Sequence, residues 1–339
     1  MILIDAIYIH SLGGLTILKT LLSGLKENKS RNYKNFHFLL DERIDVALLS
    51  EIKNYSYELV KGNHYSRKKA YQKNINLISK IICLANVPPL IKFKIPVIIY
   101  FHNLLLLENK ISYVSLYQFI LNKLKLVYVR YFNSRSYKWI VQTRYVQQKL
   151  SSKLKINKDK IEIIPIYEIK DIDYTDKDFN EKSISFFCVT SSSRHKNLKR
   201  LVKAFKNANF NKSIDYNLYI TTNGKDLNFI NKRIKYLGSI NRDKIKKYYS
   251  KSHYVILPSL VESFGLPIVE GIKSGSNVIL SNINSLKEIC KPSLNFDPLN
   301  TIDITRAIQN AANLNYETKS SITIKNEINN FINLITRNV

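Results

Sequence analysis

Two glutamates in the second half of the chain have the spacing of a ligand-binding loop. Glu262 and Glu270 lie eight residues apart in the segment LPSLVESFGLPIVEG, which begins at Leu257. A carboxylate accepts paired hydrogen bonds, so each glutamate could bind the adjacent hydroxyls of a ribose or a hexose. Two glutamates at this spacing also occur on the solvated face of an ordinary helix, and the residues between them decide between these interpretations.

Those intervening residues predict a tight turn followed by the start of a helix. Pro267 suits the first position of a helix, where a backbone N–H would have no partner. The four preceding residues then form the turn: Ser263, Phe264, Gly265 and Leu266. Free N–H groups at a helix N-terminus favour an anion, and Gly265 allows a ligand to approach the backbone closely. We therefore expect Glu262 beside a ligand and Glu270 one turn inside the helix.

The rest of the chain alternates short apolar runs with longer amphipathic ones, which is typical of a parallel sheet covered by helices. Predicted strands include Met1–Ile9, Val46–Leu49, Pro96–Phe101, Ile184–Val189 and Tyr254–Leu257, and predicted helices include Leu15–Leu25, Arg67–Leu84, Ile111–Phe132, Leu198–Asn207 and Pro267–Lys273. Ligands bind at the carboxyl ends of strands in such sheets. Two candidate positions there are Gly13-Gly14, in a turn after the first strand, and His102.

The alternation stops in an acidic stretch and then starts again, which predicts an α/β protein with two Rossmann-like domains and a cleft between them. We expect an N-terminal Rossmann-like domain at residues 1–168, a linker at 169–182 and a C-terminal Rossmann-like domain at 183–312. Residues 313–339 should form a C-terminal helix, for which packing against the first domain is one option. The acidic linker residues are Asp171, Asp173, Asp176, Asp178 and Glu181.

The glutamate segment resembles the EX7E region of family-4 retaining glycosyltransferases, whose fold is GT-B. The matching residues are Pro258, Ser259, Glu262, Phe264, Gly265, Leu266, Pro267, Glu270 and Gly275, with Gly271 in place of the usual alanine. Further segments resemble other landmarks of that family: His195-Lys196-Asn197-Leu198, Ser281-Asn282, Leu286-Lys287-Glu288 and Phe296-Asp297-Pro298. In the first half, Asn86, Pro88-Pro89, Phe101-His102-Asn103 and Val141-Gln142-Thr143 resemble members that build O-antigens and capsules.

The resemblance implies a retaining, metal-independent hexosyltransferase that uses a nucleotide-diphosphate sugar as its substrate and needs no cofactor. Glu270 would hold the donor ribose, Glu262 would contact the donor sugar, and Lys196 would neutralise the diphosphate. The backbone of Gly13 and Gly14 would approach that diphosphate, and His102 would face the reacting sugar. The resemblance makes residues 1–168 the acceptor-side domain and residues 183–312 the nucleotide-sugar-binding domain. The acceptor would be a glycan in surface polysaccharide biosynthesis, either free or carried on a lipid.

One position departs from the family pattern. Many members carry an arginine five residues before the lysine, and this chain has Ser191 there. Either Lys196 acts with backbone dipoles alone, or Arg194 or Arg200 substitutes for the missing arginine. The donor-binding residues expected from the sequence therefore include Arg194.

No cluster in the sequence has the spacing of a metal site. Asp171-Ile172-Asp173 imitates a metal-binding DxD motif, but it lies in the predicted linker and is interpreted as solvated charge. The three cysteines, Cys83, Cys188 and Cys290, are far apart, which indicates neither a disulfide framework nor a zinc site and fits a cytoplasmic setting.

The chain is strongly basic, with 53 Lys and Arg against 26 Asp and Glu and a net charge of +27. Such a charge could attract nucleic acid, an anionic membrane or a phosphorylated substrate. The tyrosines are scattered, so a nucleic-acid-binding protein is the alternative and not the expectation. A GT-B protein with another reaction, such as an epimerase or an inactive subunit, is a further alternative. The helix Ile111–Phe132, with Lys123, Lys125 and Arg130, is either a core helix or a peripheral contact with the inner face of the plasma membrane.

Overall fold

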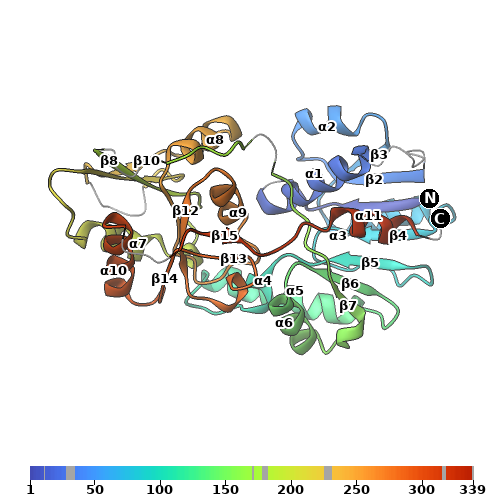
Figure 1. Ribbon diagram of the computed structural model, residues 1–339. Coiled ribbons are helices and arrows are strands. Elements are labelled where there is room, and N and C mark those ends of the chain that lie inside the picture. Colours follow the sequence, from blue (N-terminus) through green and yellow to red (C-terminus); the bar gives the residue numbers. More distant parts are fainter. Residues whose placement is uncertain are drawn as a thin grey trace. The chain divides into compact units, whose positions relative to one another are not determined.

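The computed structural model describes residues 1–10, 12–27, 35–169, 172–177, 182–224, 231–314 and 318–337. The chain forms two compact units, each built on its own sheet (Figure 1). The first unit consists of residues 1–107, 121–168 and 325–339, and the second consists of residues 108–120 and 169–324. Asp171, Asp178 and Glu181 of the predicted linker lie outside the described residues.

In the described part of the first unit, seven parallel strands form one sheet in the order β3-β2-β1-β4-β5-β6-β7. The strands are β1 (Ile2–Ala6), β2 (Phe36–Asp41), β3 (Ser56–Val60), β4 (Lys80–Cys83), β5 (Val97–Tyr100), β6 (Lys138–Val141) and β7 (Ile161–Ile163). The helices are α1 (Leu12–Glu27), α2 (Val46–Ile52), α3 (His64–Asn74), α4 (Leu104–Leu107), α6 (Arg144–Leu154) and α11 (Ile328–Thr336), and α5 (Leu116–Phe132) begins in the segment 108–120. Strands β1, β2, β4 and β5 are buried along their whole length, as expected for a parallel sheet covered on both faces.

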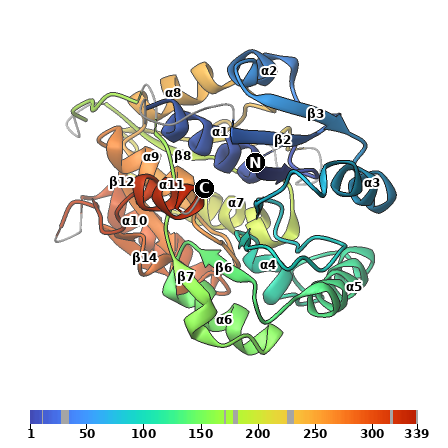
Figure 2. The same ribbon diagram turned by 90° about the vertical axis from the view of Figure 1, so that its right-hand side faces the viewer.

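The C-terminal helix α11 completes the core of the first unit. It lies beside α1 (Figure 1 and Figure 2), and its residues Phe331, Ile332 and Ile335 belong to the same buried cluster as the central strands. The ammonium group of the buried Lys80 donates to the carbonyls of Ile335, at 3.0 Å, and Arg337, at 2.6 Å. Since the last carbonyls of a helix have no partner within it, Lys80 stabilises the end of α11.

The second unit repeats this architecture in a sheet whose described strands run parallel in the order β10-β9-β8-β11-β12-β14. Its elements are β8 (Ser183–Cys188), α7 (Leu198–Asn207), β9 (Asp215–Ile220), β10 (Ile234–Tyr236), α8 (Arg242–Lys251), β11 (Tyr254–Leu257), α9 (Leu266–Lys273), β12 (Asn277–Ser281), β14 (Leu294–Phe296) and α10 (Thr301–Ala312), with an antiparallel pair of β13 (Cys290–Lys291) and β15 (Ser321–Ile322). If the strands of each sheet are numbered in chain order, both sheets follow the same doubly wound order, 3-2-1-4-5-6, and the first sheet adds a seventh strand. The prediction of two Rossmann-like domains is confirmed.

Three local predictions in the first unit are wrong. Residues 46–49 begin the helix α2 and are not a strand, because the side chain of Asp45 accepts a hydrogen bond from the Ala47 N–H and caps a helix there. The predicted helix Arg67–Leu84 covers the C-terminal part of α3, which ends at Asn74, and then the buried strand β4. The edge strand β3, whose side chains are mostly exposed, gave no apolar signal and was not predicted.

Two helices begin at residues other than the predicted ones. Helix α1 begins at Leu12, so Gly13 and Gly14 lie in its first turn and not in a separate turn before it. The first amides of a helix have no partner within the helix, so this placement keeps their N–H groups available. The predicted helix Ile111–Phe132 begins at Leu116, where the Ser115 hydroxyl accepts a hydrogen bond from the Gln118 N–H at 3.2 Å.

Helix α9 packs on β11 through Gly271, the residue that replaces the usual alanine. A Cβ atom on Gly271 would lie 2.6 Å from Cγ2 of Val255, which is much closer than van der Waals contact. Both residues are buried, so the surrounding core leaves little room for adjustment. The glycine therefore sets how closely α9, which carries Glu270, approaches the sheet.

We expect Gly271→Ala to lower the free energy of unfolding by about 1–3 kcal/mol, because the added methyl group overpacks the core against Val255. Gly13→Ala is the matched control, since a Cβ there meets no atom within 4 Å. In a helix that substitution should leave stability unchanged or raise it by up to about 1 kcal/mol. Urea denaturation measures both, and a Gly271→Ala protein as stable as the parent would contradict the packing account.

Candidate active site

An ion pair joins two loops at the carboxyl edge of the second sheet. Lys196 ends a short 3-10 helix, Arg194–Lys196, after β8, and Glu262 lies in the loop between β11 and α9. The Lys196 Nζ atom donates to Oε2 of Glu262 at 2.6 Å. Strands β8 and β11 are neighbours, so the sheet itself brings the two loops together. The two residues that the sequence placed at the donor therefore contact each other.

The charges at this ion pair follow from its surroundings. Burial raises the pKa of Glu262, but the charge and hydrogen bond of Lys196 and the Ser263 N–H outweigh it, so that the pKa lies below its ordinary value. For His195, burial and then the charge of Lys196 lower the pKa to about 4, although Glu262 acts in the opposite direction. At neutral pH, Glu262 is therefore ionised and His195 is neutral.

Asn197 connects three loops of the site, although the sequence alone indicated no role for it. Its backbone is left-handed, with φ 58°, and its buried side-chain Nδ2 donates to the carbonyls of Pro258 at 3.0 Å and Pro298 at 2.7 Å. The Leu260 N–H donates to the His195 carbonyl at 2.7 Å. The segments around residues 195, 258 and 297, which carried the resemblance, thus form one hydrogen-bonded cluster.

Glu270 is buried on the second turn of α9 and already has two partners. The Tyr249 hydroxyl donates to its Oε2 at 2.7 Å, and the half-exposed Arg242 guanidinium forms an ion pair with its Oε1. Within the described structure, the buried Oε1 has this ion pair but no hydrogen bond. A buried carboxylate oxygen without a donor suits a ligand hydroxyl.

The loop between the two glutamates has a backbone that only glycine adopts easily. Gly265 has φ 72° and forms the N-terminal cap of α9. A Cβ atom there would lie 2.8 Å from Cδ1 of Ile268 and 3.3 Å from Cγ of Glu262. Phe264 is buried beneath the loop, and Ser263 contributes its N–H to Glu262. The helix begins at Leu266, so Pro267 occupies its second position and not the predicted first one.

The arginines that could replace the one missing at Ser191 have different positions. The Arg194 guanidinium donates to the carbonyl of Val114 at 3.4 Å. The Arg200 guanidinium donates to Oδ1 of Asn197 at 2.8 Å and thereby supports the residue that connects the loops. Arg200 thus acts on the site through Asn197, while the donor-binding role of Arg194 stays a prediction.

The first unit brings the other predicted residues to the carboxyl edge of its own sheet. His102 follows β5, and its N–H donates to Oδ1 of Asn86, which follows β4, at 2.6 Å. Its Nε2 lies 3.1 Å from the Leu84 carbonyl, which can only accept, and 3.2 Å from Nδ2 of Asn86, which can only donate, so these two groups hold Nε2 whichever ring nitrogen carries the proton. A Cβ on Gly14 would lie 3.7 Å from Cε1 of His102, which places these two residues together. Burial lowers the pKa of His102 to about 4, so its ring is neutral.

The described residues offer neither a metal site nor a membrane-spanning helix. These residues contain no group of three or more His, Cys, Asp or Glu side chains placed to hold a metal ion. Across the same residues, no helix has the length and the apolar character that are needed to cross a bilayer.

Comparison with solved structures identifies the fold of this chain as GT-B. The structure of Alr3699/HepE from Anabaena in complex with UDP and glucose matches 91% of this chain and 89% of its own, with a TM-score of 0.64 and 13% identity. The apo form of the lipopolysaccharide outer core galactosyltransferase WaaB matches 93% and 91%, with a TM-score of 0.63 and 13% identity.

The sequence match is concentrated in the second unit. Residues 170–326, nearly all of which belong to the second unit, match the family model described as glycosyl transferases group 1. The O-antigen chain mannosyltransferase RfbU of Salmonella typhimurium is 27% identical over 151 residues, which are 42% of this chain and 42% of that protein. The chain thus spans less than half the length of the curated relatives that it matches.

The neutral state of His195 predicts a pH effect on stability. Between pH 7 and pH 5 the unfolded chain binds a proton at this histidine, with a pKa of about 6.5, whereas the folded chain does not, so the free energy of unfolding falls. In His195→Gln this fall should be smaller by about 1–2 kcal/mol. Urea denaturation at pH 7 and pH 5 measures the fall in the free energy of unfolding. Equal falls in the parent and in His195→Gln would contradict a neutral His195 in the folded protein.

Proposed function

We propose that this protein is a retaining glycosyltransferase that transfers a sugar from a nucleotide-diphosphate donor to a glycan in surface polysaccharide biosynthesis. The observation that carries the proposal is the Lys196–Glu262 ion pair at the carboxyl edge of the second sheet, in the loop that leads into the helix of the buried Glu270. This arrangement lies within residues 170–326, which match the group 1 family model. The names of RfbU and WaaB support an O-antigen or lipopolysaccharide setting.

In this proposal the second unit binds the donor nucleotide. Glu270 accepts a ribose hydroxyl at Oε1, the oxygen without a hydrogen-bond donor, while Tyr249 and Arg242 keep the carboxylate in place. Lys196 lies against the diphosphate together with the backbone of Ser263–Leu266 at the start of α9, where N–H groups favour an anion. Because HepE binds UDP, a uridine nucleotide is the first donor to test.

The chemistry requires one bond to break and one to form on the same face of the sugar. The bond between the anomeric carbon and the phosphate oxygen breaks, and the diphosphate leaves with the electron pair. The acceptor hydroxyl forms the new bond to that carbon and gives its proton to the departing phosphate, which makes a separate general base unnecessary. Lys196 stabilises the negative charge that develops, which is often the largest contribution to catalysis, and Glu262 contacts hydroxyls of the transferred sugar.

The first unit contributes neutral groups to the same reaction. His102 would contact the reacting sugar through Nδ1, since its other nitrogen is turned to the Leu84 carbonyl. A neutral imidazole can orient a hydroxyl without repelling the positive charge that develops on the sugar ring. The first-turn amides of Gly13 and Gly14 would approach the diphosphate.

Calorimetry with UDP, GDP, ADP and CMP, and with the matching nucleosides, tests the donor site. We expect one diphosphate to bind. Lys196→Ala should weaken that diphosphate at least about tenfold and leave the nucleoside unchanged, because it removes a charge-assisted contact to phosphate. Glu270→Gln should weaken both, because it replaces the carboxylate that accepts the ribose hydroxyl with a neutral amide, which is a weaker acceptor. Lys199→Ala, an exposed neighbour on α7, is the control and should change neither.

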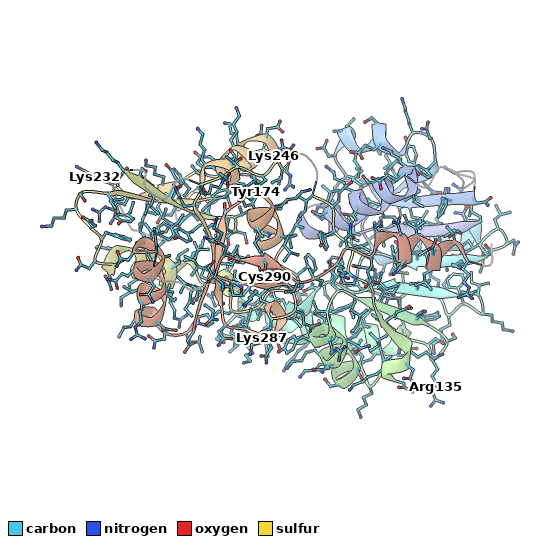
Figure 3. All side chains as sticks on the ribbon, in the orientation of Figure 1. Arg135, Tyr174, Lys232, Lys246, Lys287 and Cys290 are labelled. Carbon is cyan, nitrogen blue, oxygen red and sulfur yellow. The ribbon has the colours of Figure 1, made fainter. Side chains whose placement is uncertain are left out.

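The proposal fails at this test if no nucleotide binds. Single-stranded DNA binding with a steep dependence on salt would then favour the nucleic-acid alternative. Figure 3 gives that alternative little support within the second unit, because the labelled basic side chains Lys232, Lys246 and Lys287 come from different segments of that unit.

We further propose that α5 contacts an anionic membrane. One face of the helix is both apolar and exposed: Tyr117 (72%), Ile120 (49%), Leu124 (60%), Val127 (61%) and Tyr131 (73%). Their spacing of three and four residues puts them on a single stripe, and the exposed Lys123 and Lys125 flank it. Arg130 instead donates to the Lys153 carbonyl at the end of α6, at 2.6 Å. A core helix would bury such a stripe, so its exposure favours a lipid surface.

Sedimentation with vesicles of phosphatidylcholine and phosphatidylglycerol tests this contact. Leu124→Ser with Val127→Ser should abolish binding, and Lys123→Gln with Lys125→Gln should weaken it about fivefold for each lysine removed. Leu77→Ser with Leu299→Ser, two exposed leucines elsewhere, is the matched control and should bind like the parent. Equal binding of all four proteins would contradict a role for α5.

A further inference from the structure

Three aromatic side chains form a cluster at the carboxyl edge of the first sheet. Tyr8 lies two residues after β1, His64 begins α3 and Tyr128 belongs to α5. The Tyr8 hydroxyl lies 3.3 Å from Nδ1 of His64. The His64 ring stacks on Tyr128, with centroids 5.1 Å apart and an interplanar angle of 26°. His64 is exposed and the two tyrosines are half-buried, so the cluster presents ring surface to solvent.

The backbone of Tyr8 has a conformation that a bulky residue avoids. Its φ of 76° is left-handed, which costs about 1–2 kcal/mol for a residue other than glycine. The Asp41 side chain compensates by accepting a hydrogen bond from the Tyr8 N–H at 3.0 Å, and Asp5 accepts one from the Ile7 N–H at 3.1 Å. A glycine would relieve this strain, so a tyrosine held here by two carboxylates indicates a use for its ring.

A fully buried arginine supports the cluster from below. Arg67 forms an ion pair with Asp5, with Nη2 and Oδ2 2.6 Å apart, and both side chains are inaccessible to solvent. Its Nη1 also donates to the hydroxyl of Tyr128 at 3.2 Å, and its guanidinium lies 5.7 Å from the Tyr8 ring centroid. A buried ion pair is expensive to desolvate and adds little stability by itself. Here it fixes two of the three aromatic side chains in position.

The cluster lies near the residues that the proposed reaction uses in this unit. Strands β1, β4 and β5 are neighbours in the sheet, and Tyr8, Asn86 and His102 follow them in that order. Ile9, next to Tyr8, lies within 3.5 Å of the Cβ position of Gly14, which is itself 3.7 Å from His102. A ligand held at the cluster is therefore adjacent to His102.

We propose that Tyr8, His64 and Tyr128 form a platform that binds a sugar ring of the acceptor glycan. This inference rests on the proposed glycosyltransferase function and names the part of the acceptor that is recognised. A pyranose has a face of C–H groups that packs on aromatic rings, and hydroxyls at its rim that can bond to the Tyr8 hydroxyl and the His64 ring. The platform has aromatic surface and few charges, so it suits an uncharged saccharide better than a phosphate or a nucleotide.

The test uses the full chain on an array of bacterial surface oligosaccharides, with nucleotide calorimetry on the same preparations. His64→Ala and Tyr128→Leu should each weaken saccharide binding at least about fivefold and leave nucleotide affinity unchanged, because the platform contacts only the acceptor. Tyr65→Ala is the matched control, since Tyr65 is a neighbouring aromatic residue that is 77% exposed on α3. It should bind saccharides like the parent.

The outcomes separate this proposal from the proposed function. Saccharide binding that is unchanged in His64→Ala and Tyr128→Leu would overturn the platform, as would a parent protein that binds a nucleotide but no saccharide on the array. Saccharide binding that is lost in these two variants, in a protein that binds no nucleotide, would support the platform and refute the glycosyltransferase. Tyr128→Phe, which keeps the ring and removes only the hydroxyl, should retain most of the binding if stacking is the cause.

Discussion

The arrangement of loops at the carboxyl edge of the second sheet depends on the ion pair between Lys196 and Glu262. Each side chain is largely withdrawn from water, so either charge without the other would carry a large desolvation cost. The pair is favourable only if two loops from neighbouring strands meet within hydrogen-bond distance. Asn197 provides that closeness by bonding both Pro258 and Pro298, and Arg200 in turn holds the Asn197 side chain. The neutral His195 beside the pair adds no further positive charge.

The two sheets use the same edge for groups of different chemistry. The second sheet presents charged groups: Lys196 and Glu262 pair with each other, and Glu270 pairs with Arg242. Around His102 the first sheet presents neutral groups, this imidazole and a set of aromatic rings, over the fully buried Asp5–Arg67 pair. At the end of β2, the half-exposed Arg43 pairs with Asp41. This division fits a charged nucleotide donor on one unit and an uncharged sugar on the other.

The sequence predicted the second unit better than the first, for physical reasons. The loop from Pro258 to Glu270 combines a proline at a helix start, a glycine with positive φ and a paired carboxylate, and these are local requirements that leave a local pattern. The partners of Glu270 leave no such pattern, since Tyr249 and Arg242 come from another helix and meet the glutamate only through packing. The same holds for Tyr8, His64 and Tyr128, which are distant in the chain.

In the first unit, hydrophobic periodicity did not predict the type of the shortest helices and strands correctly. The run Val46–Leu49 is too short to distinguish a strand from a helix, and the deciding residue is the cap, Asp45. Strand β4 has four residues, so a helical interpretation of the preceding residues could be extended through it. Strand β3 lies at the sheet edge and exposes most of its side chains.

The most direct measurement is a crystal structure of the protein with the nucleoside diphosphate that it binds. The account predicts that a phosphate oxygen lies within hydrogen-bond distance of Lys196 Nζ and that a ribose hydroxyl donates to Oε1 of Glu270. A nucleotide bound away from both residues, with the Lys196–Glu262 contact and the surroundings of Glu270 unchanged, would contradict the assignment of this edge as the donor site.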